Sequence, residues 1–223
     1  MSKYRLIYEK NDEVKYLGHL DTMTMFDRTF RRADIKLKFS QGFNPKPNIV
    51  FALPSGSGLI SKSEIIEIEL EEDVEENKLI ERLNNNLPNG FNIITANYVT
   101  DNKSLMAKVI ESEYEVYIKF EHENNKDELA EKVIDIFNSN EILVDKKVKP
   151  DKPKVDIDIK SFIINVYVEK YVDNDEYDIC IKMKAKAGSK DNLRPDYIIQ
   201  AIEKNGLAIY DYQIIRTNLI LNE

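Results

Sequence analysis

The most constraining stretch of the sequence is Ser40–Pro47, which consists of SQGFNPKP. Proline fixes its own φ angle and lacks an amide donor, whereas glycine allows backbone angles that other residues avoid. A segment with one glycine and two prolines in eight residues therefore cannot continue a helix or fill the centre of a sheet. Extended runs flank it at residues 35–39 and 49–53. The sequence predicts an irregular loop held between two strands.

Positive charge gathers around this loop. The whole chain has a formal net charge of -8, with 32 Lys and Arg against 40 Asp and Glu. Between residues 18 and 54 the balance is reversed, because three aspartates stand there against a larger set of cations: Arg28, Arg31, Arg32, Lys36, Lys38 and Lys46. A local excess of cations in an acidic chain indicates an anionic partner bound through a patch.

Hydrophobic periodicity predicts an α+β fold. We expect two tandem ferredoxin-like (βαββαβ) units with antiparallel sheets, at residues 1–102 and 103–223. The first unit has strands at 3–8, 49–53, 63–70 and 91–99, with helices at 21–33 and 73–87. The second has strands at 114–120, 142–148, 155–171, 177–185 and 209–221, with helices at 129–137 and 195–204. The strands at 155–171 and 177–185 are expected to form a hairpin.

The first helix is expected to begin at an Asp21 N-cap. Apolar residues recur at three- and four-residue steps and predict a buried stripe: Leu20, Met23, Phe26, Phe30 and Ala33. Its arginines would lie away from that stripe, either on a binding face or on a solvated one. Further along, the glutamate-rich run between Glu64 and Glu76 is interpreted as a solubilising surface.

A second candidate anion site lies in the second half. Ser189, Lys190 and Arg194 precede the last helix, whose free N-terminal amides suit a phosphate or carboxylate. Alternate lysines at 182, 184 and 186 predict a basic row on one side of the hairpin. The alternatives are an ordinary capped loop and a solvated sheet face. We expect the basic residues of both halves to border one groove.

His19, two residues before Asp21, is the candidate catalytic residue, as a general acid or base. The alternative is a residue at the start of the helix that local hydrogen bonds satisfy. His122 lies in a polar turn and is interpreted as solvated surface. Cys180 is the only cysteine and is interpreted as a buried thiol. No metal-ligand spacing occurs, so the sequence predicts neither a metal nor another cofactor.

Several motifs together resemble a known family. They are His19-Leu20-Asp21, Arg31-Arg32-Ala33, Ser40–Pro45 with Pro47, Phe51–Pro54, Ser104–Ala107, Asp158–Lys160 and Arg194-Pro195. The pattern resembles the radical SAM-linked protein family, a domain of unknown function found beside or fused to cobalamin-binding-type radical SAM proteins. The chain departs from it at Gly18, Lys46, Asn48 and Lys160-Ser161. Lys46 stands where the family has histidine, which argues against a catalytic imidazole there.

The resemblance implies partnership with a separate radical SAM enzyme, because this chain lacks the three-cysteine motif that holds an iron–sulfur cluster. We expect a cytoplasmic accessory protein without a membrane span that binds RNA or a ribonucleoprotein, or presents a substrate. The expected anion- or RNA-binding residues are Arg28, Arg31, Arg32, Lys36, Gln41, Asn44, Lys46, Lys160, Ser189, Lys190 and Arg194. The alternatives are a metal-independent endoribonuclease using His19 with Arg31, Arg32 or Lys46, and a protein that binds a small anionic metabolite.

Overall fold

The computed structural model describes residues 2–101, 103–121, 125–146, 155–170 and 176–222. The chain forms two compact units, one of residues 1–110 with 216–223 and one of residues 111–215. The first unit thus extends past residue 102 and includes the C-terminal residues. Among the described residues, no helix has the length and apolarity that crossing a bilayer requires.

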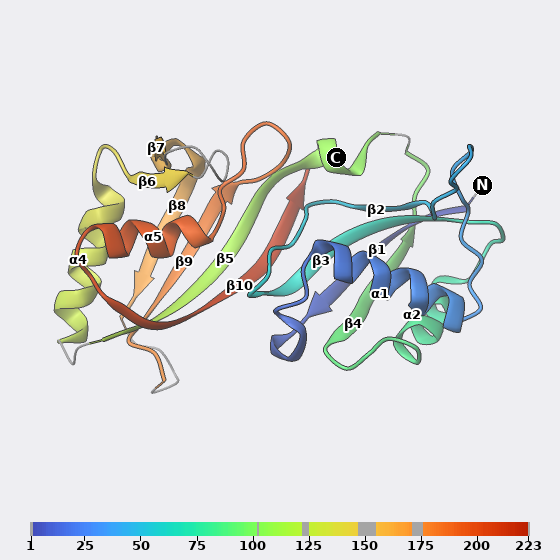
Figure 1. Cartoon of the computed structure of the whole chain (residues 1–223), viewed down its shortest axis with the longest axis horizontal. Helices are drawn as coiled ribbons and strands as arrows, with labels where there is room; N and C mark the ends of the chain where they lie inside the picture. The colour runs from blue at the N-terminus through green and yellow to red at the C-terminus, as the bar shows by residue number, and fades with distance from the viewer. Residues whose placement is uncertain (1, 102, 122–124, 147–154, 171–175, 223) are drawn as a thin grey trace. The chain divides into compact units, whose positions relative to one another are not determined.

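The first unit is an antiparallel sheet covered by two helices. Its elements are β1 (Ser2–Lys10), a 3-10 turn (Asp12–Val14), α1 (His19–Arg32), β2 (Ile49–Phe51), β3 (Leu59–Leu70), α2 (Glu76–Asn84), β4 (Phe91–Tyr98) and the short α3 (Leu105–Lys108). The strand order is β4-β1-β3, and β2 pairs with β3 on the edge opposite β1. Phe26 and Phe30 of α1, with Leu79 and Leu83 of α2, form one core with Leu6 and the other inward residues of the sheet. Figure 1 shows both helices beside this sheet.

The second unit repeats the alternation of strands and helices. Its elements are β5 (Val109–Phe120), α4 (Lys126–Asn138), β6 (Leu143–Lys146), β7 (Val155–Asp158), a 3-10 turn (Lys160–Phe162), β8 (Ile163–Glu169), β9 (Ile179–Lys186), α5 (Asp196–Lys204) and β10 (Ile209–Leu221). The first two residues of β5 and the part of β10 from residue 216 onward belong to the first unit. The strand order is β10-β5-β9-β8, and β6 pairs only with β7. In Figure 1, α5 passes in front of β9 and β8. The predicted α+β class is confirmed, and so is the antiparallel hairpin of β8 and β9.

The start and the buried face of α1 differ from the prediction. The helix begins at His19, and its N-cap is Gly18, whose amide donates to Asp21 Oδ2 at 3.3 Å. Asp21 is therefore the third helical residue and not the cap. Leu20 is 75% exposed, because it lies about 140° around the helix axis from the centre of the buried face at 100° per residue. Thr22 and Thr29 take the buried positions instead.

The predicted acidic surface is wrong for two of its glutamates. Glu64 and Arg216 are each 2% exposed and form an ion pair at 2.5 Å. Glu67 is also buried, and it accepts from Arg5 at 2.8 Å while pairing with Lys3. Both carboxylates are tolerated inside because cations from other strands pair with them, Arg216 of β10 with Glu64 and Arg5 of β1 with Glu67.

Removing one partner of the buried pair should cost far more than removing an exposed one. We expect Arg216→Met to lower the free energy of unfolding by about 3–5 kcal/mol, because it leaves the charge of Glu64 buried. The double variant with Glu64→Leu should recover much of this loss. Glu128→Ala, which breaks the exposed Glu128–Lys132 pair, is the control and should change little. Chemical denaturation measures all four proteins, and equal effects of the two single variants would contradict the assignment.

Candidate functional site

Residues 36–49 are fastened to the C-terminal half of β3 by backbone hydrogen bonds. The Lys38 amide donates to Glu69 O at 2.8 Å, and the Glu69 amide donates to Asn48 O at 3.2 Å. The Glu71 amide donates to Lys36 O at 3.0 Å. The predicted strand at 35–39 is reduced to isolated bridges, Leu37 with Leu70 and Phe39 with Pro47. These contacts still fix both arms of the loop that lies between them.

The loop Ser40–Lys46 is closed at its base. The Ser40 amide donates to Lys46 O at 2.8 Å, and the Lys46 amide donates to Ser40 Oγ at 3.0 Å. Gly42 has a φ of 132°, a conformation that L side chains rarely adopt, which explains the glycine. Gln41, Phe43, Asn44 and Lys46 are all exposed. Phe43 is fully exposed, and Phe39 is 44% exposed. Large exposed rings on a fixed loop are typical of a binding surface.

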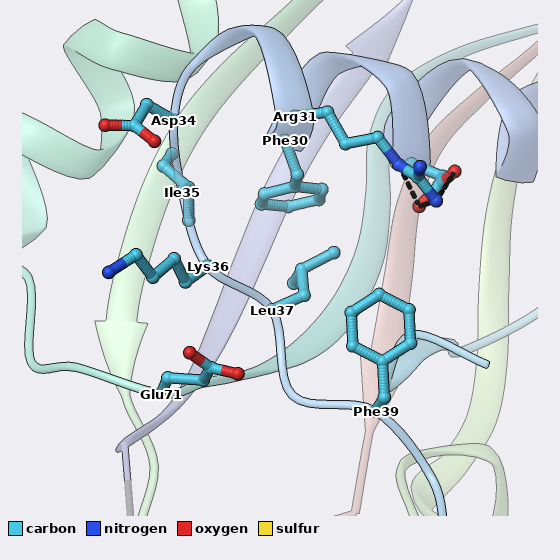
Figure 2. A pocket seen from close by; sticks show the side chains of 9 residues that line it. Phe30, Arg31, Asp34, Ile35, Lys36, Leu37, Phe39 and Glu71 are labelled. Carbon is cyan, nitrogen blue, oxygen red and sulfur yellow. Dashed lines mark hydrogen bonds and ion pairs between the residues drawn. The ribbon is translucent and has the colours of Figure 1, made fainter. Parts of the chain in front are cut away.

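A pocket of about 540 Å³ opens beside this loop, at the C-terminal end of α1. Its lining residues are Asp27, Phe30, Arg31, Asp34, Ile35, Lys36, Leu37, Phe39 and Glu71. Figure 2 shows the rings of Phe30 and Phe39 and the side chain of Leu37 gathered in it, with Arg31 turned toward its carboxylate partner. The pocket thus combines an apolar floor with a charged rim.

The rim of the pocket carries more negative than positive charge. Arg31 pairs with Asp27 at 3.0 Å, and Lys36 pairs with Glu72 at 3.1 Å. Three carboxylates line the pocket against these two cations. Within the described part of the chain, Asp34 and Glu71 have no ion-pair partner. Arg31 and Lys36 were predicted to bind an anion, but their surroundings do not favour a phosphate inside the pocket.

Two further arginines close the ends of the helices. Arg32 Nη2 donates to Asn86 O at 2.7 Å, beyond the end of α2. Arg82 of α2 donates to Ala33 O and Asp34 O, each at 2.6 Å. It thereby satisfies carbonyls at the end of α1, where Asp34 has a left-handed φ of 52°. Arg28 lies one turn before Arg32 on the same stripe and makes no ion pair with a described residue.

His19 lies at the opposite end of α1 from the pocket. Its ring packs edge-on against Phe51, with centroids 5.0 Å apart. Burial lowers the pKa of His19, and the nearby charge of Glu64 opposes this shift. Twelve residues separate His19 from Arg31, which is about 18 Å along the helix axis at 1.5 Å per residue. The two side chains therefore cannot act on the same phosphate, and the endoribonuclease alternative loses this pairing.

The segment before His19 is held by a buried lysine. Lys10 is fully buried, and its Nζ donates to Lys15 O at 3.1 Å and to Leu17 O at 2.6 Å. Burial lowers the pKa of Lys10. Because both acceptors belong to the turn that leads into α1, this lysine fixes where the helix begins. Its role in the structure is to position the chain.

The predicted cations of the second unit are largely engaged within it. Arg194 forms a two-point pair with Asp196 at 3.0 and 2.7 Å, and its guanidinium lies over the ring of Tyr197. Lys160 Nζ donates to Phe137 O at the end of α4. Ser189 and Lys190 are exposed. The predicted binding roles of these residues stay predictions.

The predicted basic row on β9 faces an acidic row. Lys182 and Lys184 lie opposite Glu115 and Glu113 in the register of β5, and they form ion pairs with Glu169 and Glu111. Lys186 lies within 3.9 Å of Asp191. The row is therefore neutralised on the sheet and is not a free basic surface. The groove expected to join both halves involves two units and stays a prediction.

The remaining predictions concern the thiol of Cys180, metal binding and His122. Cys180 is buried, and burial raises the pKa of its thiol to about 11. No group of three or more His, Cys, Asp or Glu that could hold a metal occurs in the described ranges. His122 and the connection 149–154 lie outside the described residues.

Sequence reasoning did not single out several residues of this site. Phe39, Phe43, Asp34 and Glu71 shape the loop and the pocket, and Arg82 closes the end of α1. A signal for Phe43 was present, because an aromatic residue inside a glycine- and proline-rich loop has no regular element to bury it. The roles of the other four residues depend on tertiary contacts, which the sequence does not reveal.

Comparison with known proteins places the chain first in a fold class and then in a family. Its fold is similar to a chain in the crystal structure of a Cbf5-Nop10-Gar1 complex, with a TM-score of 0.51 and 9% sequence identity. The similarity covers 96% of this chain and 48% of that one, so this chain spans about half the length of its structural relative. At that identity the likeness concerns the fold alone.

The family is established by sequence. Residues 3–195 match the family described as uncharacterized protein conserved in bacteria (DUF2344), and the chain belongs to this family. No curated protein matches the sequence. The matched range contains α1, the loop Ser40–Lys46 and the pocket.

The environment of His19 predicts a lowered pKa. We expect its imidazole to titrate below the ordinary value of 6.5 in the folded chain. Because the unfolded chain then binds the proton more tightly, the free energy of unfolding should fall as pH drops below about 6.5. An NMR titration measures this pKa, with His19→Gln to distinguish its signal from that of the second histidine. A value at or above 6.5 would contradict the described surroundings of His19.

Proposed function

We propose that the protein binds single-stranded RNA through Phe39, the loop Ser40–Lys46 and the adjoining pocket, together named the loop–pocket site. One observation carries the proposal. Two exposed aromatic rings, Phe39 and Phe43, stand beside Lys38 and Lys46, which make no ion pair with any described residue. Aromatic faces that stack bases, combined with lysines that bind phosphates, are the usual components of a single-strand binding surface.

The position of these lysines in an acidic chain supports a local site. With a net charge of -8, the chain as a whole repels polyanions. Lys46 lies on the closed loop, and Lys38 lies on the arm that is hydrogen-bonded to β3. A phosphate that approaches the loop and its arm can therefore reach both lysines. The acidic rim of the pocket then disfavours a phosphate inside it, so the backbone of the RNA would run outside the pocket.

We propose further that the protein acts as an accessory subunit of a separate radical SAM enzyme. The support is the resemblance of its motifs to the radical SAM-linked family, and the Ser40–Pro47 motif of that resemblance forms the loop of the loop–pocket site. In this arrangement the protein presents RNA, and the partner supplies the chemistry. Co-purification of the tagged chain with a radical SAM protein encoded beside it tests the partnership, and absence of that protein from the complex would contradict it.

The fold we propose for each unit is ferredoxin-like. The support is the shared strand order, β4-β1-β3-β2 in the first unit and β10-β5-β9-β8 in the second. In both, the first strand of the unit lies between the last strand and the strand that precedes the second helix. This order agrees with two split βαβ arrangements.

Removing a phosphate-binding lysine should change the salt dependence of RNA binding. For Lys46→Ala and for Lys38→Ala, we expect weaker binding and a plot of log affinity against log salt that is shallower by about 0.7 per lost phosphate contact. Lys132→Ala on α4 removes a lysine that is already paired with Glu128 and belongs to the second unit, and is the control. Fluorescence anisotropy with a labelled single-stranded RNA measures affinity at several salt concentrations. An unchanged slope for both loop variants would contradict the proposed phosphate contacts.

A further inference from the structure

The pocket of the loop–pocket site has the chemistry of a base-binding site. We propose that it receives one base of the bound RNA and selects a base with an exocyclic amino group, which means guanine, adenine or cytosine over uracil. The inference rests on the proposed function and specifies what the pocket recognises. Neither the charge of the loop nor the exposed rings alone would imply a preference among bases.

The size and lining of the pocket suit a flat heterocycle. Its volume of about 540 Å³ lies in the usual range for small-molecule sites, which is roughly 300–1,000 Å³. Phe30, Ile35 and Leu37 are buried and form an apolar floor, whereas Phe39 is half-exposed at the side (Figure 2). A base that enters from solvent can therefore stack against Phe39 while its edge reaches the rim.

The rim favours hydrogen-bond donors. Asp34 and Glu71 line the pocket and have no ion-pair partner in the described part of the chain, and Asp27 is engaged by Arg31. An ionised carboxylate only accepts hydrogen bonds. Amino groups of guanine, adenine and cytosine donate to such acceptors, whereas uracil has no amino group and its one base donor, N3–H, lies between two carbonyl oxygens that a carboxylate repels. The excess of carboxylates also repels a phosphate from the same space.

The two parts of the site match the polarity of a nucleotide. The pocket is acidic, and the adjoining loop presents Lys46, so the donors of a base would meet carboxylate acceptors and its phosphate would meet a cation. A cationic side chain of a protein partner would suit the pocket but would be repelled by Lys38 and Lys46. The observations therefore favour RNA over a basic peptide.

The wall of the pocket is already fixed in the described structure. The Ile35 amide donates to Phe30 O at 3.0 Å, and Arg82 holds the carbonyls of Ala33 and Asp34. The left-handed conformation of Asp34 is thus maintained by the hydrogen bond that its carbonyl accepts from Arg82 of α2. Little ordering would be required when a base binds, which lowers the cost of recognition.

The test compares RNAs that differ at one base. We expect the full chain to bind a labelled 12-nucleotide oligouridine, and to bind the same oligomer with one central guanine, adenine or cytosine more tightly by about 5- to 150-fold for a well-formed contact. Glu71→Gln and Asp34→Asn replace a charged group that only accepts by a neutral amide that also donates, and should reduce this preference while keeping the affinity for oligouridine. Asn tolerates a positive φ, so Asp34→Asn retains the fold. Glu81→Gln on α2 changes an exposed carboxylate that does not line the pocket, and is the matched control.

The outcomes separate the two proposals. Binding of oligouridine with no preference for the amino-bearing bases, or a preference that survives both pocket variants, overturns the base pocket and leaves the RNA-binding function standing. Absence of binding to every RNA overturns both. Binding of an arginine-rich peptide that depends on Glu71, without RNA binding, assigns the pocket to a protein partner and overturns the inference. Circular dichroism confirms that each variant is folded.

Discussion

The hydrogen bonds that fasten residues 36–49 to the C-terminal half of β3 are the interaction on which the rest of the site depends. They hold the two arms of the loop side by side, with the Asn48 amide donating to Lys38 O at 2.8 Å. Gly42 and the two prolines then leave the loop few alternative paths. Because the two ends of the loop are fixed, Phe43 stays exposed and does not pack onto the core. The first of these arms also supplies Leu37 and Phe39 to the pocket.

Charge is arranged differently inside the first unit and on its surface. In the interior, Glu64 and Arg216 pair with each other, and Lys10 donates to a backbone carbonyl, so each of these buried charged groups has a partner. On the surface, Arg31 and Lys36 are neutralised by nearby carboxylates, while Lys38 and Lys46 are left to act on a partner. Exposed pairs are weak, so their contribution lies in shaping the local field rather than in stability. The resulting contrast between an acidic pocket and a basic loop is the basis of the proposed recognition.

The sequence predicted features that depend on local chemistry. The loop at Ser40–Pro47, the α+β class, the hairpin of β8 and β9 and the helix α5 all follow from turn residues and periodicity. It did not predict the roles of Arg32 and Lys160, which donate to carbonyls 54 and 23 residues away in the chain. Nor could alternation along β3 reveal that Glu64 and Glu67 are buried, because their partners come from other strands. The neutralised lysines of β9 likewise depend on register, which no single segment determines.

In our proposal, RNA binding by the loop depends on the exposed ring of Phe43, which stacks against a base. The affinities of the wild type and of two Phe43 variants for one labelled single-stranded RNA test this stacking. Phe43→Tyr keeps a ring of similar size, whereas Phe43→Leu keeps an apolar side chain but removes the π-face. Both changes are at a fully exposed position and should leave the fold intact. We expect the Tyr variant to bind like the wild type and the Leu variant to bind about 5- to 150-fold more weakly. Equal affinities of the Leu variant and the wild type would contradict the stacking.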